Sequence, residues 1–425
     1  MADGRRYFGT DGVRGVVGEG LTETLVARLG VAFAAWSGGA PVLVGRDTRA
    51  SGPVLEAALA RGLSARGTEV TLGGVLPTPA VALLAEGCGA VVSASHNPPE
   101  YNGVKLFARG GRKLSDAEEA EIEALLPDET PAEGAEPLRD GTLRERYVEL
   151  VTERFGALLD GLRIAVDCAN GAMSGLATAA LDRLGARVTA LADAPDGTNI
   201  NVGWGATDLT ALAAATRERP HDLGVAFDGD GDRMLAVDAQ GNALDGDVIL
   251  AILALHLGVE LVAVTEMSSL GFHRLMAEHG IRTVTTPVGD RYVLEALRAH
   301  EGTLGGEQSG HVVYLDGHTT GDGLVAAILL ARAVHESGKT VSELAARLEP
   351  VPQAKRNVPV RTQTFTTMLE QELDRMNASL DGRGRILVRP SGTEPVVRVL
   401  VEAETQETAD RLCGTIAALV GRELG

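Results

Sequence analysis

Cysteine, aromatic residues and positive charge are all scarce in this 425-residue chain. The three cysteines, Cys88, Cys168 and Cys413, are far apart and form no CxxC pair. This spacing excludes a disulfide framework and a thiolate metal site, and we expect three buried small hydrophobic side chains. The 39 Lys and Arg against 58 Asp and Glu give a formal net charge of −19, which argues against a nucleic-acid surface. An anionic ligand would need basic residues gathered locally.

Long apolar runs are also missing. The N-terminal MADGRRYFGT has no apolar stretch, and the most apolar segment, residues 248–264, is interrupted by His256, Gly258 and Glu260. The sequence therefore predicts neither a signal peptide nor a membrane span. We expect a cytoplasmic protein in a reducing compartment.

One order of elements occurs three times along the chain. Strand-like segments at 42–44, 164–166 and 261–264 are followed by the small-residue loops GRDTRASG, DCANGAMSG and TEMSSLG, and then by helix-like stretches. A glycine and a second strand follow each helix, and a third strand ends in VVSASHNP, VAFDGDGDR or TLGGEQSGH. This alternation predicts three α/β units with parallel strands and right-handed crossovers. The alternative to a true internal repeat is that βαβ units look alike whatever their ancestry.

Composition suggests where the units end. The acidic segment 125–141 resembles a surface loop. The segment 350–360 contains three prolines and predicts an extended linker. The tail from 385 predicts a small α+β domain. We expect domains at 1–157, 158–250, 251–354 and 355–425.

The loop DGDGDR, residues 228–233, carries three carboxylates at alternate positions with glycines between them. Such carboxylates converge on a hard cation, and acidic ligands without His or Cys favour Mg²⁺ over zinc. An EF-hand is excluded because Arg233 stands at position 6 and Ala239 at position 12. The alternative is a solvated acidic turn.

The loop SASHNP, residues 93–98, places Ser95 after a strand and beside His96. A serine hydroxyl needs a base or a metal to act as a nucleophile, so Ser95 alone is more often an ordinary loop residue. Neighbouring positions on an extended chain point to opposite sides, so we do not expect a hydrolase-type Ser–His pair.

Four further loops contain groups suited to phosphate, groups suited to sugar hydroxyls, or single basic residues. RPSGTEP, from Arg389, has the composition of a phosphate cradle, with Arg398 on the next strand, although a plain β-turn is the alternative. GEQSGH, from Gly306, offers hydrogen-bonding groups for sugar hydroxyls. FGTDGVRG and NGVKLF add Arg14 and Lys105, for which the alternative is a surface cation.

Taken in order, FGTDGVRG, SASHNP, DGDGDR, GEQSGH and RPSGTEP resemble the successive motifs of the α-D-phosphohexomutase superfamily over essentially the whole chain. VDCANGA, GATDLTAL, VGDRYVLE and TTGDG are similar to the bacterial hexosamine-phosphate branch. The resemblance implies three similar α/β domains with mixed sheets of βαβ repeats and a smaller C-terminal α+β domain, arranged around a central cleft.

The resemblance also implies roles for individual residues. Ser95 would be a phosphoserine whose phosphate binds one Mg²⁺ together with Asp228, Asp230 and Asp232, and Arg233 would lie beside the transferring group. The general acid/base candidates are Lys105 and His311, and Arg14 and His96 would support the phosphoserine. The implied substrate-binding residues are Asp290, Arg291, Glu307, Ser309, Arg389, Ser391, Gly392, Thr393 and Arg398.

The implied reaction interconverts glucosamine 6-phosphate and glucosamine 1-phosphate through a 1,6-bisphosphate, which also serves as activator, and supplies UDP-N-acetylglucosamine and cell-wall synthesis. The resemblance further implies a homodimer. Rival interpretations are a mutase for mannose or glucose phosphates, a Mg²⁺-dependent phosphatase, and a sugar-phosphate-binding protein without turnover.

Overall fold

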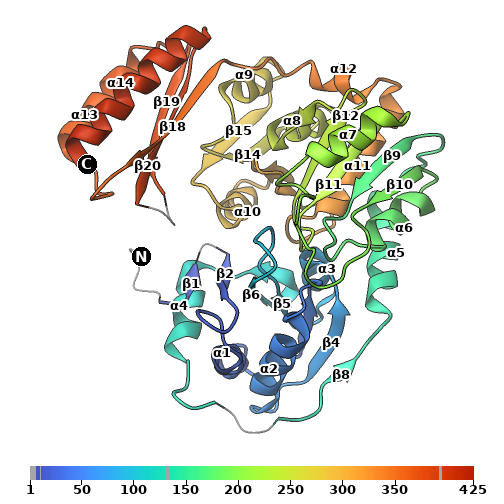
Figure 1. The fold of residues 1–425 in the computed structure, drawn as a ribbon. Helices are drawn as coiled ribbons and strands as arrows, with labels where there is room; N and C mark the ends of the chain where they lie inside the picture. Colours follow the sequence, from blue (N-terminus) through green and yellow to red (C-terminus); the bar gives the residue numbers. More distant parts are fainter. Residues whose placement is uncertain (1–5, 10, 131–133, 392–394) are drawn as a thin grey trace. The chain divides into compact units, whose positions relative to one another are not determined.

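The structure, a computed structural model, describes residues 6–9, 11–130, 134–391 and 395–425. The chain forms two compact units: unit 1 comprises Met1–Met267 and Gly280–Arg347, and unit 2 comprises Ser268–His279 and Leu348–Gly425. Unit 1 contains three β-sheets and unit 2 contains one (Figure 1).

The first sheet has the strand order β1-β2-β6-β5-β3-β4-β8, with β7 paired to β6. Its strands are β1 (Phe8–Gly9), β2 (Gly12–Val16), β3 (Val42–Arg46), β4 (Val70–Val75), β5 (Cys88–Val92), β6 (Tyr101–Ala108), β7 (Arg112–Lys113) and β8 (Leu138–Arg139). Its helices are α1 (Glu23–Trp36), α2 (Gly52–Ser64), α3 (Thr78–Leu84), the short 3₁₀ helix η1 (Arg109–Gly111), α4 (Asp116–Ala124) and α5 (Leu143–Phe155).

The second sheet has the order β10-β9-β11-β12-β13 and the third the order β15-β14-β16-β17. The second contains β9 (Arg163–Asp167), β10 (Arg187–Leu191), β11 (Leu223–Phe227), β12 (Met234–Asp238) and β13 (Ala243–Leu244), with helices α6 (Leu176–Arg183) and α7 (Thr210–Glu218). The third contains β14 (Leu261–Thr265), β15 (Arg282–Thr286), β16 (Leu304–Gly306) and β17 (Val312–Tyr314). The helices that follow the second sheet in unit 1 are α8 (Gly246–Leu257), α10 (Asp290–Ala299), α11 (Gly323–Ser337) and α12 (Val341–Ala345).

The predicted repeat is confirmed by the strand order, which is the same in all three sheets. In each, the second strand, the first, the third and a return strand lie side by side: β4-β3-β5-β6, β10-β9-β11-β12 and β15-β14-β16-β17. The first three strands of each set are parallel, but the return strand is antiparallel to the third. The sheets are therefore mixed rather than purely parallel, because the loops at 93–100, 228–233 and 307–311 are too short for the crossover that a parallel return needs.

Unit 2 contains the sheet β18-β20-β19 together with α9 (Leu270–Glu278), α13 (Thr367–Ala378) and α14 (Gln406–Leu424). Its strands are β18 (Gln353–Pro359), β19 (Arg385–Pro390) and β20 (Val396–Glu402), all antiparallel. The predicted small α+β domain is therefore present. The predicted linker at 350–360 is wrong in one respect: its extended chain is an edge strand of this sheet, a position that tolerates proline at the strand ends.

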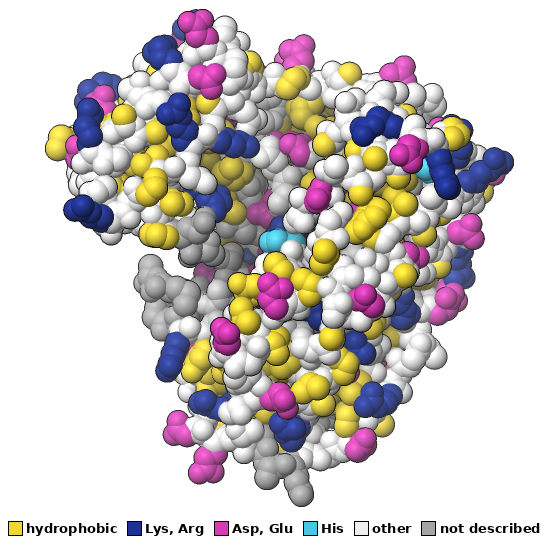
Figure 2. Space-filling model, in the orientation of Figure 1, with side chains coloured by type: hydrophobic (Ala, Val, Ile, Leu, Met, Phe, Trp, Pro, Cys, Tyr) yellow, Lys and Arg dark blue, Asp and Glu magenta, His cyan; other side chains and the backbone are white. Residues whose placement is uncertain are grey.

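The central strands β5, β11 and β14 are buried along their whole length, as expected for strands covered on both faces. All three cysteines lie in the described part of the chain and are buried free thiols, as predicted. No helix among the described residues has both the length and the apolar character needed to cross a membrane. Acidic and basic side chains are interspersed on the face drawn in Figure 2.

Candidate active site

The serine loop follows β5 and turns back at once into β6. Ser95 is 1% exposed and adopts φ +54°, a left-handed conformation that is uncommon for a non-glycine residue. Its amide donates to Ser93 Oγ at 2.9 Å, and its carbonyl accepts from Arg49 at 3.0 Å and from Asn201 Nδ2 at 2.9 Å. These contacts fix the backbone that carries the hydroxyl.

The aspartate loop joins β11 to β12, and its backbone is fastened from three sides. The carbonyls of residues 229–231 accept in turn from the amides of Ala172 (2.8 Å), Thr78 (2.9 Å) and Gly323 (3.0 Å). Gly229 is required here, since a Cβ at this position would lie 2.5 Å from the carbonyl oxygen of Ser95. Elements associated with all three sheets therefore hold the loop against the serine loop.

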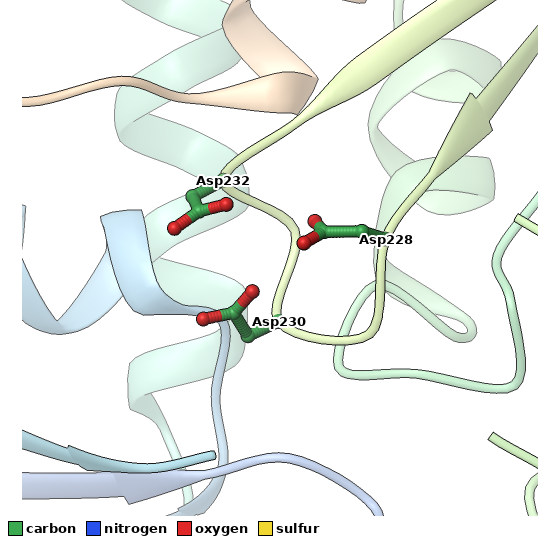
Figure 3. A group of neighbouring side chains, drawn as sticks. All are labelled: Asp228, Asp230 and Asp232. Carbon is green, nitrogen blue, oxygen red and sulfur yellow. The ribbon is translucent and has the colours of Figure 1, made fainter. Parts of the chain in front are cut away.

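The three carboxylates of this loop turn toward one another (Figure 3). Asp228, Asp230 and Asp232 are all buried, and one oxygen of each lies within 4.8 Å of the others. Ser95 Oγ donates to Asp228 Oδ2 at 2.5 Å. The hydroxyl and the aspartate cluster, 133 residues apart in sequence, therefore form one site.

The expectation that Ser95 and His96 point to opposite sides is wrong. Its Nδ1 lies 3.1 Å from Ser95 Oγ, because the left-handed backbone at Ser95 removes the alternation expected of an extended chain. Burial, followed by the nearby Arg233 and Arg14, lowers the pKa of His96 to about 4. The ring is therefore neutral near pH 7 and can exchange a hydrogen bond with the serine.

Lys105, on β6, lies within the carboxylate cluster. Its Nζ is 2.7 Å from Asp230 Oδ2, 2.7 Å from Asp232 Oδ2 and 2.8 Å from Asp11 Oδ2. Burial works to lower the pKa of Lys105, but these three carboxylates outweigh it and raise the pKa well above its ordinary value. In this arrangement Lys105 stays protonated and stabilises negative charge.

The carboxylates differ in their protonation. Burial, reinforced by Asp232 and Asp230, raises the pKa of Asp228 to about 8. Burial would also raise the pKa of Asp230, but Lys105 and hydrogen bonds from Lys105 and Thr78 hold it below the ordinary value.

The site has the donors that a hard divalent cation needs. Among the described residues, neither Asp230 Oδ1 nor Asp232 Oδ1 has a hydrogen-bond partner, although both are buried. Buried carboxylate oxygens without partners are costly unless a cation or water satisfies them. Oxygen-only donors at this spacing fit Mg²⁺.

Arg233 and Arg14 lie close enough to His96 to lower its pKa. The Arg233 amide donates to Asp228 Oδ1 at 3.2 Å. Burial works to lower the pKa of the Arg233 guanidinium, but Asp232 and Asp228 outweigh it and raise the pKa. Arg14, on β2, pairs with Asp11.

His311 begins the return into β17 and is 3% exposed. Its Nε2 lies 3.1 Å from Asp290 Oδ2, and its Nδ1 is 3.9 Å from Asp232 Oδ1. Burial opposes protonation of His311, but Asp290 and Asp232 raise its pKa. Asp290 also pairs with Lys113, so the histidine belongs to the same charged network as the aspartate loop.

Glu307 and Arg291, both predicted to bind or border the substrate, have different neighbours in the structure. Glu307 accepts from the Gly289 amide at 2.9 Å and from Ser309 Oγ at 3.3 Å, which brings the GEQSGH loop beside the start of α10. The Arg291 guanidinium pairs instead with Asp116 and Glu119 of α4.

In unit 2, Arg389 and Arg398 stand opposite each other on β19 and β20. Ser391 is buried, its amide donates to the Val396 carbonyl at 2.9 Å, and its Oγ lies 3.4 Å from Arg398 Nη2. Gly392 and Thr393 lie outside the described residues. Two guanidinium groups and a hydroxyl thus come from one end of this sheet, which suits a phosphate.

Some site residues were not singled out from the sequence. Asp11 lies within FGTDGVRG and forms ion pairs with Lys105 at 2.8 Å and with Lys113 at 2.9 Å. Arg49 lies within GRDTRASG, whose position after a strand was the only available signal. Nothing local marked Thr78.

Comparison with known proteins first gives the protein family to which the chain is similar. The phosphoglucomutase/phosphomannomutase family matches in four parts: alpha/beta/alpha domain I at residues 5–133, domain II at 145–241, domain III at 245–351 and the C-terminal domain at 329–419. A crystal structure of a phosphoglucomutase/phosphomannomutase family protein from Burkholderia thailandensis has a TM-score of 0.84 and 27% identity over 97% of this chain and 96% of that one. Aspergillus fumigatus N-acetylphosphoglucosamine mutase, in complex with GlcNAc-6P and magnesium, shares the fold with a TM-score of 0.72 at 19% identity, over 100% and 97% of the two chains.

A curated relative then narrows the class. The phosphoglucosamine mutase of Thermobifida fusca (strain YX) is 47% identical over 443 residues, covering 99% of both chains. The chain belongs to the phosphoglucosamine mutases of the α-D-phosphohexomutase superfamily.

Proposed function

We propose that this enzyme interconverts glucosamine 6-phosphate and glucosamine 1-phosphate, with Ser95 as the residue that carries the phosphoryl group. The observation that carries the proposal is the contact between Ser95 Oγ and the aspartate cluster at 2.5 Å. Full-length identity of 47% to a phosphoglucosamine mutase supports the choice of sugar.

The reaction consists of two phosphoryl transfers. In the first, the bond from Ser95 Oγ to phosphorus breaks and a bond to O1 of glucosamine 6-phosphate forms, which gives the 1,6-bisphosphate. In the second, the phosphoryl group on O6 returns to Ser95 and glucosamine 1-phosphate leaves. Such transfers depend on in-line positioning and on neutralising the charge of the phosphoryl oxygens.

The residues around Ser95 supply both requirements. The contacts to Ser93 and Asn201 fix the left-handed backbone that carries the hydroxyl, and Arg233 and Lys105 supply positive charge. Asp228, Asp230 and Asp232 would hold one Mg²⁺ together with the phosphate on Ser95. When bound, Mg²⁺ would neutralise charge on the transferring group.

We propose that His311 takes up the proton that the sugar hydroxyl loses when it attacks phosphorus. Asp290, 3.1 Å away, orients the ring and stabilises its charged form. His96 and Arg14 would support the phosphoserine, and Lys105 would hold its proton throughout.

Binding of the substrate needs two kinds of contact. Glu307 and Ser309 would bind sugar hydroxyls, and Asp290 and Arg291 would border that site. Arg389, Ser391, Gly392, Thr393 and Arg398 would hold the phosphate that is not reacting. Because the bisphosphate must reverse its orientation between the two transfers, a separate phosphate site that accepts either phosphate is required.

We further propose domain boundaries at 1–157, 158–250, 251–354 and 355–425, which separate the four sheets except for the first two residues of β18. We propose a cytoplasmic enzyme, consistent with three free thiols, and a bisphosphorylated hexosamine as the activator. The homodimer stays a prediction.

The test compares initial rates with the 6-phosphates or 1-phosphates of glucosamine, mannose and glucose, in the presence of Mg²⁺ and the matching 1,6-bisphosphate. We expect the highest kcat/KM with glucosamine phosphate. A higher kcat/KM with mannose or glucose phosphate would overturn the sugar assignment. Stoichiometric release of inorganic phosphate would indicate a phosphatase instead.

A further inference from the structure

Thr78 is the first residue of α3 and lies between Pro77 and Pro79. Its side chain is 1% exposed. It comes from the first repeat of the fold, whereas the aspartate loop comes from the second.

Two hydrogen bonds connect Thr78 to a single residue of that loop. Thr78 Oγ1 donates to Asp230 Oδ2 at 2.7 Å, and the Thr78 amide donates to the Asp230 carbonyl at 2.9 Å. One bond fixes the backbone of Asp230 and the other fixes its carboxylate. Since proline precedes Thr78 and follows it, the backbone that presents both donors has little freedom.

The two oxygens of Asp230 consequently face different surroundings. Oδ2 receives the Thr78 hydroxyl and the Lys105 ammonium, which lies 2.7 Å away. Oδ1 is buried and has no hydrogen-bond partner among the described residues. A quarter-turn of the carboxylate about its Cβ–Cγ bond would take both oxygens out of these positions, and the Thr78 hydroxyl opposes that rotation.

We propose that Thr78 is a positioning residue that orients Asp230 so that Oδ1 faces the cation. Groups that hydrogen-bond a ligating carboxylate fix its orientation, and their loss typically costs about 10–100-fold in metal affinity or activity. The proposal rests on the Mg²⁺ site of the proposed function and adds to it a residue from outside the aspartate loop.

The experiment measures binding of Mn²⁺, used as a probe for the Mg²⁺ site, by the loss of its free-ion paramagnetic resonance signal. The variants are Thr78→Val, which keeps the branched shape without the donor, and Thr78→Ser, which restores the hydroxyl. Thr216→Val is the matched control, because Thr216 is equally buried and its hydroxyl, among the described residues, binds only the Leu212 carbonyl at 2.8 Å within α7. Thr78→Ala provides a second variant without the donor in case Thr78→Val does not fold.

We expect the dissociation constant for Mn²⁺ to rise about tenfold or more in Thr78→Val and Thr78→Ala, and to stay near the wild-type value in Thr78→Ser and Thr216→Val. The Mg²⁺ concentration for half-maximal turnover should rise in parallel, while kcat at saturating Mg²⁺ changes much less. A merely structural role would lower kcat without moving the Mg²⁺ requirement.

Two results would overturn the proposal in distinguishable ways. Wild-type affinity in the folded Thr78→Val protein, or an equal loss in Thr216→Val, would remove Thr78 from this role and leave the Mg²⁺ site standing. Failure of the wild-type protein to bind Mn²⁺ at all would remove the site itself.

Discussion

Replacing Arg49 by lysine should loosen the serine loop, because the guanidinium of this fully buried residue uses all of its donors. Nε donates to Asp47 Oδ2 at 2.8 Å, and the two terminal nitrogens donate to three carbonyls of the loop and to one at the start of β6. Those carbonyls belong to Ser95 (3.0 Å), Asn97 (2.7 Å), Pro98 and Tyr101 (3.0 Å).

The expected loss in the free energy of unfolding follows from counting hydrogen-bond donors. An arginine side chain has five N–H donors and a lysine has three, so Arg49→Lys leaves at least two of the five acceptors without a partner. Each buried hydrogen bond to a charged group contributes about 1.5–3 kcal/mol, which predicts a loss of about 3–6 kcal/mol in the free energy of unfolding. Because the loop carries Ser95, the rate of phosphoryl uptake should fall by about 100-fold if the hydroxyl moves by about 1 Å.

The assay combines urea unfolding, followed by circular dichroism, with mass spectrometry of Ser95 phosphorylation by hexosamine bisphosphate. Because the transition midpoint is the free energy of unfolding divided by the denaturant slope, the expected loss lowers the midpoint of the urea transition. Arg46→Lys is the control, because Arg46 is partly exposed and lies 3.6 Å from its Glu56 partner. An Arg49→Lys protein with wild-type stability and phosphorylation rate, or an equal loss in Arg46→Lys, would refute the reasoning.

Three further predictions concern other parts of the molecule. Ser95→Ala should abolish turnover and phosphorylation, since the accepting oxygen is gone; mutant turnover near the wild-type rate would exclude the proposed role. Arg398→Ala should raise KM about tenfold or more by removing charged hydrogen bonds to the non-reacting phosphate, and an unchanged KM would contradict the phosphate site. Burial raises the pKa of Asp167 to about 6, against hydrogen bonds from the Gly205 and Ala169 amides. The stability from this raised pKa is complete below about pH 4 and is lost as the pH rises through 6, so the unfolding free energy of Asp167→Asn relative to wild type should increase by about 3 kcal/mol between pH 4 and 7. Urea unfolding at both pH values measures this change, and a constant difference would count against it.

Several elements were predictable because their signals are local. The alternation of strand, loop and helix placed the three repeats, and the position of each polar loop after a buried strand placed the chemistry at strand ends. The segment 350–360 was misjudged because an extended chain with prolines has the same local pattern in a linker and in an edge strand. Only its pairing with β20 distinguishes the two.

The sequence by itself determined which chemical groups are available and in what order: a serine after one strand, three carboxylates after another and basic residues near a small C-terminal sheet. The tertiary structure decided which of them touch. The left-handed backbone at Ser95, its contact with Asp228, and the bonds from Arg49 and Thr78 all depend on packing between segments far apart in the chain. Local propensity carries no information about such contacts, because each exists only when whole repeats have folded and docked against one another.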